Sequence, residues 1–380
     1  MISAAGFLAP AKVNLFLHVV GRRADGYHLL DSLVVFADIG DRVEASLSDI
    51  PSLVVGGPEA NAVADLGDDN LVLRAARLYI DAASGAGAAA LSLDKQLPTA
   101  SGIGGGSSDA AATLRLLDHL SDGAVAPVVL AALAARLGAD VPACLAARPV
   151  WVGGIGEVLE PADGVPEAGI VLANPRIALP TPAVFRGRSG PFSEPGRFAA
   201  MPRDSAALAA VLADCRNDLT EPALKLVPEI AGVLDRLAGL PGALLARMSG
   251  SGATSFALFP DRAAALAAHA ALRRAEPGWW SAAGALLTQA PPIEALPQSG
   301  RTPPDETRPS ARCLPCDANK PEERGDEDTR IRQRSRRNRG GCDAAAACRD
   351  PGSGANAGRL VSSIVPRRTT ARRPAGRDLP

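Results

Sequence analysis

Two kinds of apolar spacing alternate along the first 290 residues of the chain. Apolar side chains at every second position predict strands, and apolar side chains three or four apart predict helices. The predicted strands cover residues 7–20, 27–36, 40–47, 89–93, 170–173 and 284–289, with hairpins at 150–159 and 244–259. The predicted helices cover 69–79, 107–120, 127–137, 206–214, 222–238 and 261–275, and a mobile loop is predicted at 187–204. Because no regular βαβ repeat connects these elements, the pattern predicts an α+β fold rather than a doubly wound sheet.

A glycine-rich stretch at residues 98–108 precedes and overlaps the start of the helix predicted at 107–120. It has four glycines in five positions, then two hydroxyl side chains, and a carboxylate follows it. Glycine lets a ligand approach the backbone closely, and a helix start presents unpaired N–H groups at the positive end of the helix dipole. A flexible surface loop is the alternative, but such a loop would not run straight into a helix with Ser107, Ser108 and Asp109 at its start. The stretch therefore predicts an anion site, most often one for phosphate.

Three familiar phosphate-binding patterns do not fit this stretch. A Walker A loop ends in Gly-Lys-Ser/Thr, whereas Gly106 is followed directly by Ser107. The dinucleotide fingerprint requires a third glycine where Ser107 stands. The His-Arg-Asp and Asp-Phe-Gly signals of a protein kinase occur nowhere in the chain. What remains is the pattern Pro-x-x-x-Gly-(Leu/Ile)-Gly-Gly-Gly-Ser-Ser.

Charge divides the chain into two unlike parts, although its formal net charge is only −1. The first 290 residues carry 22 Lys and Arg against 29 Asp and Glu, a net of −7, which gives no support to nucleic-acid binding. The last 90 residues carry 18 against 12, a net of +6, and no aromatic residue. A Pro- and Arg-rich segment of this kind cannot bury enough apolar surface to offset its chain entropy. Residues 291–380 are therefore predicted to form a disordered tail.

The six cysteines are divided between these two parts. Cys144 and Cys215 lie in apolar or helical settings and are expected to be reduced core residues. In the tail, Cys313 and Cys316 would suit zinc, but the second pair, which begins at Cys342, is separated by five residues rather than two, and no histidine lies nearby. We therefore expect no metal site built from these cysteines.

Neither a secretory leader nor a membrane span is evident in the pattern. Lys12 and Asn14 interrupt the apolar start, and no small-residue cleavage site follows a clean apolar core. No run approaches the ~18 apolar residues that a membrane-spanning helix needs. We therefore expect a cytoplasmic protein that does not bind membranes.

Lys12 and Asn14 also mark one face of the strand predicted at 7–20, because residues two apart in a strand point the same way. A lysine on a buried strand needs an anionic partner or a ligand, although an exposed edge strand would explain it as well. The chain holds 36 arginines and only 4 lysines. This bias hints that arginine cannot replace Lys12.

Two further features could carry either chemistry or structure. Tyr27 and His28 follow a turn, where they could stack on a base and hydrogen-bond to it, or simply pack within a strand. Asp140 lies between a helix stop at Gly138 and an apolar segment, where it could be a functional carboxylate or the N-cap of a following helix. The local pattern alone leaves both alternatives open.

Taken in order, these motifs resemble those of the GHMP kinases, a family of small-molecule kinases. The motifs are Pro-Ala-Lys12-Val-Asn14-Leu, Asp-Gly26-Tyr27-His28, Asp69-Asn70-Leu, the stretch 98–108, Gly138-Ala-Asp140-Val-Pro, Pro180-Thr-Pro and Gly250-Ser-Gly-Ala253. Lys-Val-Asn, Gly-Tyr-His and Gly-Ala-Asp-Val-Pro narrow the resemblance to the branch that phosphorylates a cytidine diphosphate derivative of methylerythritol in non-mevalonate isoprenoid biosynthesis. The resemblance covers residues 1 to about 290, and the tail has no counterpart in the family.

The resemblance implies a two-domain GHMP kinase fold. Residues 1–165 would form an ATP-binding domain of the ribosomal-protein-S5-like domain 2 type, and residues 166–290 a ferredoxin-like GHMP domain. It further implies ATP and Mg²⁺ as cofactors and cytidine diphosphate methylerythritol as the small-molecule substrate. The protein would be a monomer or a weak homodimer.

The resemblance also implies catalytic and nucleotide-binding roles. Asp140 would be the general base that accepts the proton of the substrate hydroxyl, and Lys12 would keep that carboxylate ionised and stabilise charge on the transferring phosphoryl group. Phosphoryl transfer asks mainly for positioning and charge neutralisation, which a lysine, a magnesium ion and a nest of backbone N–H groups can provide. The loop that would wrap the ATP phosphates, with its two serines near the triphosphate or Mg²⁺, consists of Pro98, Thr99, Ala100, Ser101, Gly102, Ile103, Gly104, Gly105, Gly106, Ser107 and Ser108.

Substrate recognition is implied in the same way. Asn14 would orient the substrate or Asp140. The cytosine would be recognised by Tyr27, His28 and Phe185.

Two loop positions depart from the family pattern. Ile103 stands where leucine is expected, and Ser101 replaces a glycine, which would stiffen the loop. Two alternative functions remain open: another GHMP kinase, acting on homoserine, mevalonate or a sugar, and a non-catalytic nucleotide-binding protein on the same fold. Loss of Lys12 or Asp140 would mark the non-catalytic alternative, and both residues are present.

Overall fold

Residues 3–83, 87–297 and 313–315 are described by the computed structural model. The strands are β1 (Ala4–Arg22), β2 (His28–Ser48), β3 (Ser52–Gly56), β4 (Ala88–Asp94), β5 (Val150–Gly154), β6 (Val158–Pro161), β7 (Gly169–Asn174), β8 (Leu245–Met248), β9 (Ser255–Phe259), β10 (Trp280–Leu287), β11 (Glu294–Ala295) and β12 (Cys313–Pro315). The α-helices are α1 (Leu71–Ala82), α2 (Gly105–Leu120), α3 (Pro127–Leu137), α4 (Val141–Ala146), α5 (Thr181–Gly187), α6 (Ser205–Ala213), α7 (Thr220–Leu226), α8 (Glu229–Ala238) and α9 (Arg262–Ala275). Among the described strand pairs only β3 and β4 run parallel, which confirms the α+β prediction.

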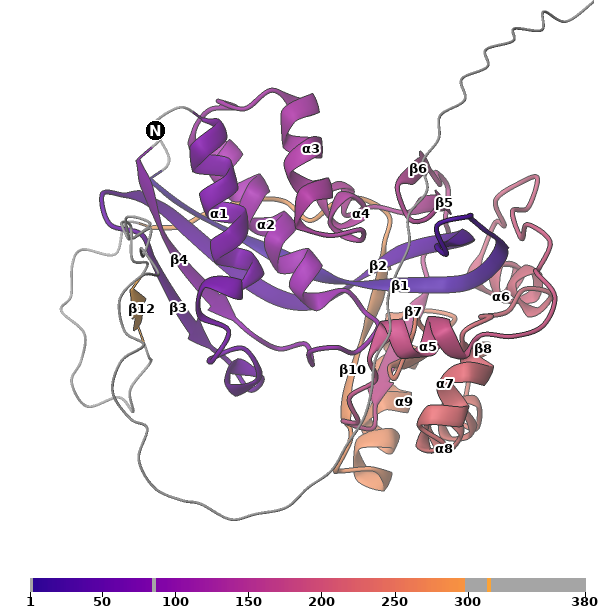
Figure 1. The fold of residues 1–380 in the computed structure, drawn as a ribbon. Coiled ribbons are helices and arrows are strands. Elements are labelled where there is room, and N and C mark those ends of the chain that lie inside the picture. Colours follow the sequence, from indigo (N-terminus) through magenta and orange to yellow (C-terminus); the bar gives the residue numbers. More distant parts are fainter. Residues whose placement is uncertain (1–2, 84–86, 298–312, 316–380) are drawn as a thin grey trace, which may run out of the picture. The chain divides into compact units, whose positions relative to one another are not determined.

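The two longest strands of the sheet, β1 and β2, pair with each other antiparallel (Figure 1). β2 runs unbroken, whereas the sequence pattern predicted two strands at 27–36 and 40–47, so that prediction was wrong. Gly40 does not interrupt the strand because its missing side chain lets β1 come close: a Cβ there would lie 2.2 Å from the carbonyl oxygen of Ala9. The register shifts between Pro10 and Lys12, and an irregularity of this kind re-aims the side chains around it.

Helices α1 to α4 lie on one face of this sheet (Figure 1). The sequence assigned Ala111, Leu114 and Leu117 to the inner stripe of the helix that is now α2, and all three are buried between α2 and the strands. A second apolar cluster joins α8 and α9 to β7 and β9. The central position of α2 fixes where its N-terminus, and with it the glycine stretch, lies.

Several element boundaries follow from local chemistry. α1 begins at Leu71 because the side chain of Asn70 accepts a hydrogen bond of 2.9 Å from the N–H of Val72, a capping contact expected from the sequence. α2 begins at Gly105, two residues before the predicted start. The helix predicted at 222–238 is divided into α7 and α8, and Pro228, which cannot continue a helix hydrogen-bond ladder, stands at the start of α8.

A mobile loop was predicted at 187–204. α5 ends at Gly187, and residues 188–204 contain no helix or strand before α6 begins at Ser205. This segment is attached to β1 and β2 at several points. The N–H of Ser193 donates to the carbonyl of Val19 over 2.9 Å, and Asp31 accepts from Gly196 N over 2.7 Å and from Arg197 Nε over 3.0 Å. These contacts tie the segment to the sheet.

β10 connects the strands of the two predicted domains, since it pairs with β2 on one side and with β7 on the other. All described residues fall within one compact unit, and the division into 1–165 and 166–290 stays a prediction. Within the described ranges, every helix is too short or too polar to cross a bilayer.

Most of the predicted tail, at 298–312 and 316–380, lies outside the described residues, as do Cys316, Cys342 and Cys348. The described part extends past the predicted boundary at residue 290. β11 pairs with β1 and β12 pairs with β3, and Arg42 forms an ion pair of 2.8 Å with Glu294.

Candidate active site

The side chains of Lys12, in β1, and Asp140, directly before α4, contact each other. The ammonium of Lys12 donates to Asp140 Oδ1 over 3.0 Å. The lysine side chain is almost completely buried in β1, at 8% exposure, whereas the aspartate side chain is 52% exposed. An ion pair with one buried cation and one accessible carboxylate is an arrangement that can present both groups to a ligand.

Asp140 occupies the N-cap position of α4, as the structural alternative from the sequence proposed. Its carboxylate makes no capping hydrogen bond to α4 among the described residues. Instead, its contact is with Lys12, and Pro142 occupies the first turn of the helix. The side chain is therefore available for chemistry rather than used by the helix end.

The glycine stretch passes directly over Lys12. Its Ile103 carbonyl accepts a hydrogen bond of 2.9 Å from the N–H of Lys12, and the Ile103 side chain is fully buried. Gly102 adopts a φ of +77° and lies against the turn 249–252, where a Cβ would stand 2.7 Å from the carbonyl oxygen of Gly252. Gly104 adopts a φ of +66° as the N-cap of α2. These close approaches account for glycine at both positions.

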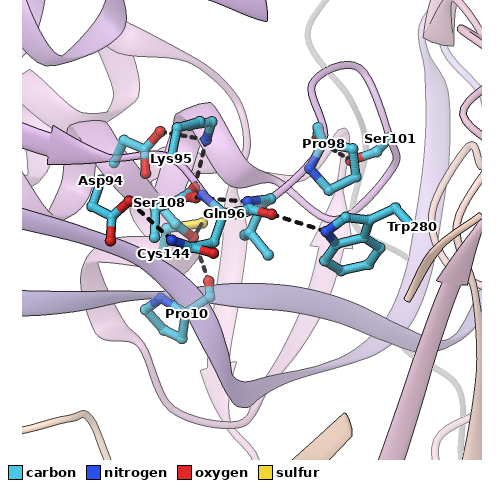
Figure 2. Close-up of polar contacts among 12 residues, drawn as sticks. Pro10, Asp94, Lys95, Gln96, Pro98, Ser101, Ser108, Cys144 and Trp280 are labelled. Carbon is cyan, nitrogen blue, oxygen red and sulfur yellow. Dashed lines mark hydrogen bonds and ion pairs between the residues drawn. The ribbon is translucent and has the colours of Figure 1, made fainter. Parts of the chain in front are cut away.

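At the start of the stretch, Ser101 closes a turn by donating its hydroxyl proton to the Pro98 carbonyl over 2.6 Å (Figure 2). Its own carbonyl accepts a hydrogen bond from Thr254 N. The hydroxyl contact is one that a glycine could not make, whereas the carbonyl contact does not depend on the side chain.

The first turn of α2 faces a cavity of about 320 Å³. The N–H groups of Gly105, Gly106 and Ser107 precede the first intrahelical bond, which runs from Ser108 N to Gly104 O over 2.8 Å. The cavity is lined by every residue from Pro98 to Ser107 except Gly102 and Ile103, and by Val63, Leu66, Asp69, Asn70, Leu71, Leu93, Lys95, Asp109, Asp140 and Thr181. An apolar end and an N–H-rich end suit a nucleotide.

The two serines of the loop differ in their surroundings. Ser107 lines the cavity. The hydroxyl of Ser108 is buried and donates to the Pro10 carbonyl over 2.7 Å, with Cys144 Sγ at 3.3 Å (Figure 2). Burial raises the pKa of Cys144 to about 12, so this thiol stays protonated and unreactive.

A buried charge cluster lies under the same helix start. The ammonium of Lys95 donates to Asp41 Oδ2 over 2.5 Å and to Asp109 Oδ2 over 2.7 Å. All three side chains are at most 4% exposed. Burial alone would lower the pKa of Lys95, but the two carboxylates outweigh it and raise that pKa. Burial raises the pKa of Asp109 well above its usual value, and Lys95 opposes this only in part.

A second cavity of about 210 Å³ is bordered by both Lys12 and Asp140. Its polar wall includes Asn14, whose Nδ2 donates to Ser32 Oγ over 2.8 Å. Asn14 Oδ1 is buried and has no hydrogen-bond partner among the described residues. The apolar wall consists of Leu17, Leu30, Val34, Val152, Ile155, Phe185 and Leu219.

The predicted base-recognition residues take unequal positions. Phe185 lines the second cavity and stacks on His28, with ring centroids 5.4 Å apart and an interplanar angle of 28°. Burial, followed by the charges of Arg22 and Arg188, lowers the pKa of His28, so its imidazole is neutral at pH 7. Tyr27 is 62% exposed, and neither it nor His28 borders the cavity.

Gly104, Asp140 and Thr181 line both cavities. The Thr181 hydroxyl lies 2.7 Å from that of Ser251. A nucleotide in the first cavity would have its phosphates at the α2 N-terminus, and an acceptor would occupy the second cavity. The two ligands would therefore meet beside the Lys12–Asp140 pair. This arrangement suits the transfer of a phosphoryl group to a hydroxyl.

Sequence reasoning gave no role to Lys95 or Asp41. It named Asp109 only as a carboxylate at a helix start and Thr181 only as part of the motif Pro180-Thr-Pro. For Lys95 a signal existed, since the scarcity of lysine applies to it as much as to Lys12. The contact of Asp41 and Asp109 with Lys95 gave no such signal, because each is one of 41 acidic residues and their partnership depends on the packing of β2 against α2.

Two family models match the chain within the regions that form this site. The GHMP kinases N terminal domain matches residues 70–148, and the GHMP kinases C terminal domain matches residues 199–278. The first match contains the glycine stretch and Asp140.

Individual proteins are similar over nearly their whole lengths. The 4-diphosphocytidyl-2-C-methyl-D-erythritol kinase of Paramagnetospirillum magneticum is 52% identical over 280 residues, which cover 74% of this chain and 98% of that protein. The enzyme of the same name from Ruegeria pomeroyi is 54% identical over 286 residues, covering 73% and 98%.

Solved structures of GHMP kinases are also similar to this chain. A crystal structure of 4-(cytidine 5'-diphospho)-2C-methyl-D-erythritol kinase superimposes with a TM-score of 0.60 at 37% identity, covering 74% of this chain and 98% of that one. The homoserine kinase from Cytophaga hutchinsonii, at 18% identity and a TM-score of 0.54, covers 77% and 98% and shares the fold. The chain belongs to the 4-diphosphocytidyl-2-C-methyl-D-erythritol kinase family, a branch of the GHMP kinases.

Proposed function

We propose that this chain transfers the γ-phosphoryl group of ATP to the 2-hydroxyl of 4-(cytidine 5'-diphospho)-2-C-methyl-D-erythritol, giving the 2-phosphate and ADP in non-mevalonate isoprenoid biosynthesis. The observation that carries the proposal is the Lys12–Asp140 pair, at 3.0 Å, beside two cavities that share Asp140. The names of the relatives that are more than half identical supply the substrate.

In the proposed reaction Asp140 accepts the proton of the substrate hydroxyl as its oxygen bonds to the γ-phosphorus. A half-exposed carboxylate on the cavity wall can reach such a hydroxyl without a rearrangement of α4. The Lys12 ammonium neutralises charge on the transferring group. The N–H groups at the start of α2 hold the phosphates, and the ADP oxygen takes up the electrons of the broken bond.

The residues present fit Mg²⁺ only as an ion that arrives with the phosphates. Among the described residues no cluster of three or more His, Cys, Asp or Glu side chains could hold a metal ion. Mg²⁺ normally keeps several waters and binds one or two protein oxygens together with substrate phosphates. Ser107 on the cavity wall would supply such an oxygen. When bound, the ion would neutralise phosphate charge.

The cytosine would be recognised at the aromatic end of the second cavity. Phe185, with the His28 ring stacked against it, offers a flat apolar ring to this cavity, and base stacking on such a ring contributes about 1–3 kcal/mol. Tyr27, next to this stack, is exposed enough to close over a bound base. Asn14 Oδ1, buried without a partner among the described residues, would accept a hydrogen bond from a substrate hydroxyl.

The test is an ATP-consumption assay with the cytidine diphosphate substrate, homoserine and mevalonate in parallel. We expect turnover with the first compound alone. Turnover with homoserine or mevalonate but not with the cytidine diphosphate compound would contradict the substrate assignment. ADP binding without turnover of any compound would favour the non-catalytic alternative.

The same assay on a chain ending at residue 297 tests the tail. This end point keeps β11 and the Arg42–Glu294 pair, which a chain ending at residue 290 would lose. We expect equal turnover by the two chains. A large loss in the shorter chain would show that turnover needs residues after 297, among them β12, which pairs with β3.

A further inference from the structure

The buried cluster of Lys95, Asp41 and Asp109 has no part in the chemistry proposed above. Its three members come from three separate segments: Asp41 from β2, Lys95 from the residue after β4, and Asp109 from the first turns of α2. The ammonium contacts both carboxylates at 2.5 and 2.7 Å. The cluster therefore joins the sheet to the helix that carries the glycine stretch.

The cluster also fixes the chain that leads into the glycine stretch. Asp41 Oδ1 accepts hydrogen bonds from Gln96 N over 2.6 Å and from Leu97 N over 2.8 Å. The Gln96 carbonyl accepts from the Trp280 indole over 2.9 Å, as Figure 2 shows. Lys95 itself is held at its backbone, where its N–H donates to the Gly56 carbonyl over 2.8 Å. Residues 95–97 are thus held from both sides before the loop begins.

The ammonium lies directly behind the first residue of α2. A Cβ added to Gly105 would stand 3.1 Å from Lys95 Nζ and 3.6 Å from Asp41 Oδ2. The backbone of Gly105 therefore rests on the charged cluster, with no side chain between them. A displaced cluster would leave this first turn without that support.

General stability is a weak explanation for such a cluster. Replacing a buried ion pair by packed apolar residues is often neutral or stabilising, because two charges must be removed from water. Lys95 and Asp109 border the nucleotide cavity. A direct phosphate contact by the ammonium is nevertheless disfavoured, because it already engages both carboxylates and its side chain is 1% exposed. The role that remains for the cluster is to hold the backbone of residues 95–97 and of the first turn of α2 in one arrangement.

We infer that Lys95, Asp41 and Asp109 are positioning residues that fix the first turn of α2, so that the N–H groups of Gly105, Gly106 and Ser107 converge on the nucleotide phosphates. The inference rests on the proposed function in one respect only, that the cavity at this helix start binds ATP. It does not depend on the identity of the acceptor.

The test measures ADP binding by calorimetry on the full chain, with and without Mg²⁺, because ADP binding needs no acceptor substrate. Asp109→Asn keeps an oxygen that can accept from Lys95 but removes the charge. We expect it to weaken ADP binding at least tenfold while the KM for the acceptor changes less than twofold. If Lys95 were instead a nucleotide ligand restrained by Asp109, the same variant would bind ADP more tightly, which would overturn the inference.

Gly105→Ala tests the inference without removing any charge, and alanine favours the helix. Its methyl group would stand 3.1 Å from the Lys95 ammonium, which must shift by a few tenths of an ångström inside a cluster held on both sides, so we expect a loss of ADP affinity. Leu114→Ala is the control, since this buried residue lies on the same helix and contacts the apolar core. It should lower the melting temperature and leave ADP affinity within twofold.

Three outcomes would overturn the inference. One is unchanged ADP affinity in Asp109→Asn with its fold retained, and another is unchanged affinity in Gly105→Ala. The third is an equal loss of affinity in Leu114→Ala. Failure of the unaltered chain to phosphorylate the cytidine diphosphate substrate would contradict the proposed function, and the ADP comparison would still decide this inference.

Discussion

Lys12 and Asp140 are separated by 128 positions in the chain and yet their side chains meet at 3.0 Å. The lysine is fixed in β1, directly under the glycine stretch, and the aspartate stands at the start of α4. Because α4 packs on α2 and β1 in one apolar cluster, the pair is set by the core rather than by any local motif.

Replacing Asp140 with Asn should lower kcat by roughly 10²- to 10⁴-fold, the usual loss when a general base is removed. The KM values for ATP and the acceptor should change little, since an amide occupies the same volume. Steady-state kinetics at saturating concentrations of both substrates measure this. Asp235→Asn, on the exposed face of α8, is the matched control. Unchanged turnover in the Asp140 variant would refute its proposed role.

Gly102→Ala should disrupt the contact between the glycine stretch and the turn 249–252. The new methyl would stand 2.7 Å from two carbonyl oxygens at a φ of +77°, so we expect a loss of about 1–3 kcal/mol in the free energy of unfolding together with loss of turnover. Chemical denaturation provides the measurement. Gly232→Ala, in α8 with open space around it, should instead gain about 0.5–1 kcal/mol. Equal stability of the two variants would contradict this account.

Phe185→Ala should raise the KM for the cytidine diphosphate substrate by roughly 5- to 150-fold, which corresponds to about 1–3 kcal/mol of base stacking. The KM for ATP should not change, because Phe185 borders only the second cavity. Phe185→Leu separates stacking from packing, since leucine fills the apolar site without an aromatic face. If the leucine variant binds substrate as the parent chain does, cytosine stacking on this ring is ruled out.

The lowered pKa of Asp218 leads us to expect that the folded chain loses stability in acid. Burial alone would raise the pKa of its carboxyl, but hydrogen bonds from Ser193, Val19 N and Arg216 outweigh burial and lower that pKa below 3.8. The unfolded chain therefore binds the proton first, so the stabilisation is complete above about pH 3.8 and is lost as the pH falls through the lower folded value.

Asp218→Asn should accordingly reduce the free energy of unfolding at pH 7 by about 1–3 kcal/mol. The difference from the parent chain should shrink as the pH falls below 4, which urea titrations at several pH values would show. The same replacement at the exposed Asp214 should change the free energy by less than about 0.5 kcal/mol. A difference that is constant with pH would exclude the carboxylate as its source.

Local patterns were sufficient for much of the fold. The helix predicted at 127–137 has those bounds in the structure, since Pro127 starts it and Gly138 follows its end. The glycine stretch lies at a helix N-terminus, as its composition predicted. Such features depend on the backbone preferences of residues close together in the chain, and a sequence displays these directly.

Other features were settled only by packing between distant segments. β2 continues through Gly40 because β1 lies against it. The Asp140 carboxylate contacts Lys12 rather than capping α4, because packing in the core brings β1 and α4 together. The cluster of Lys95, Asp41 and Asp109 joins segments 14 and 54 positions apart. The sequence alone determined the residue types and those elements that local preferences specify, whereas the tertiary structure decided which charges meet, because burial of the apolar faces of α2 and α4 on the sheet brings them together.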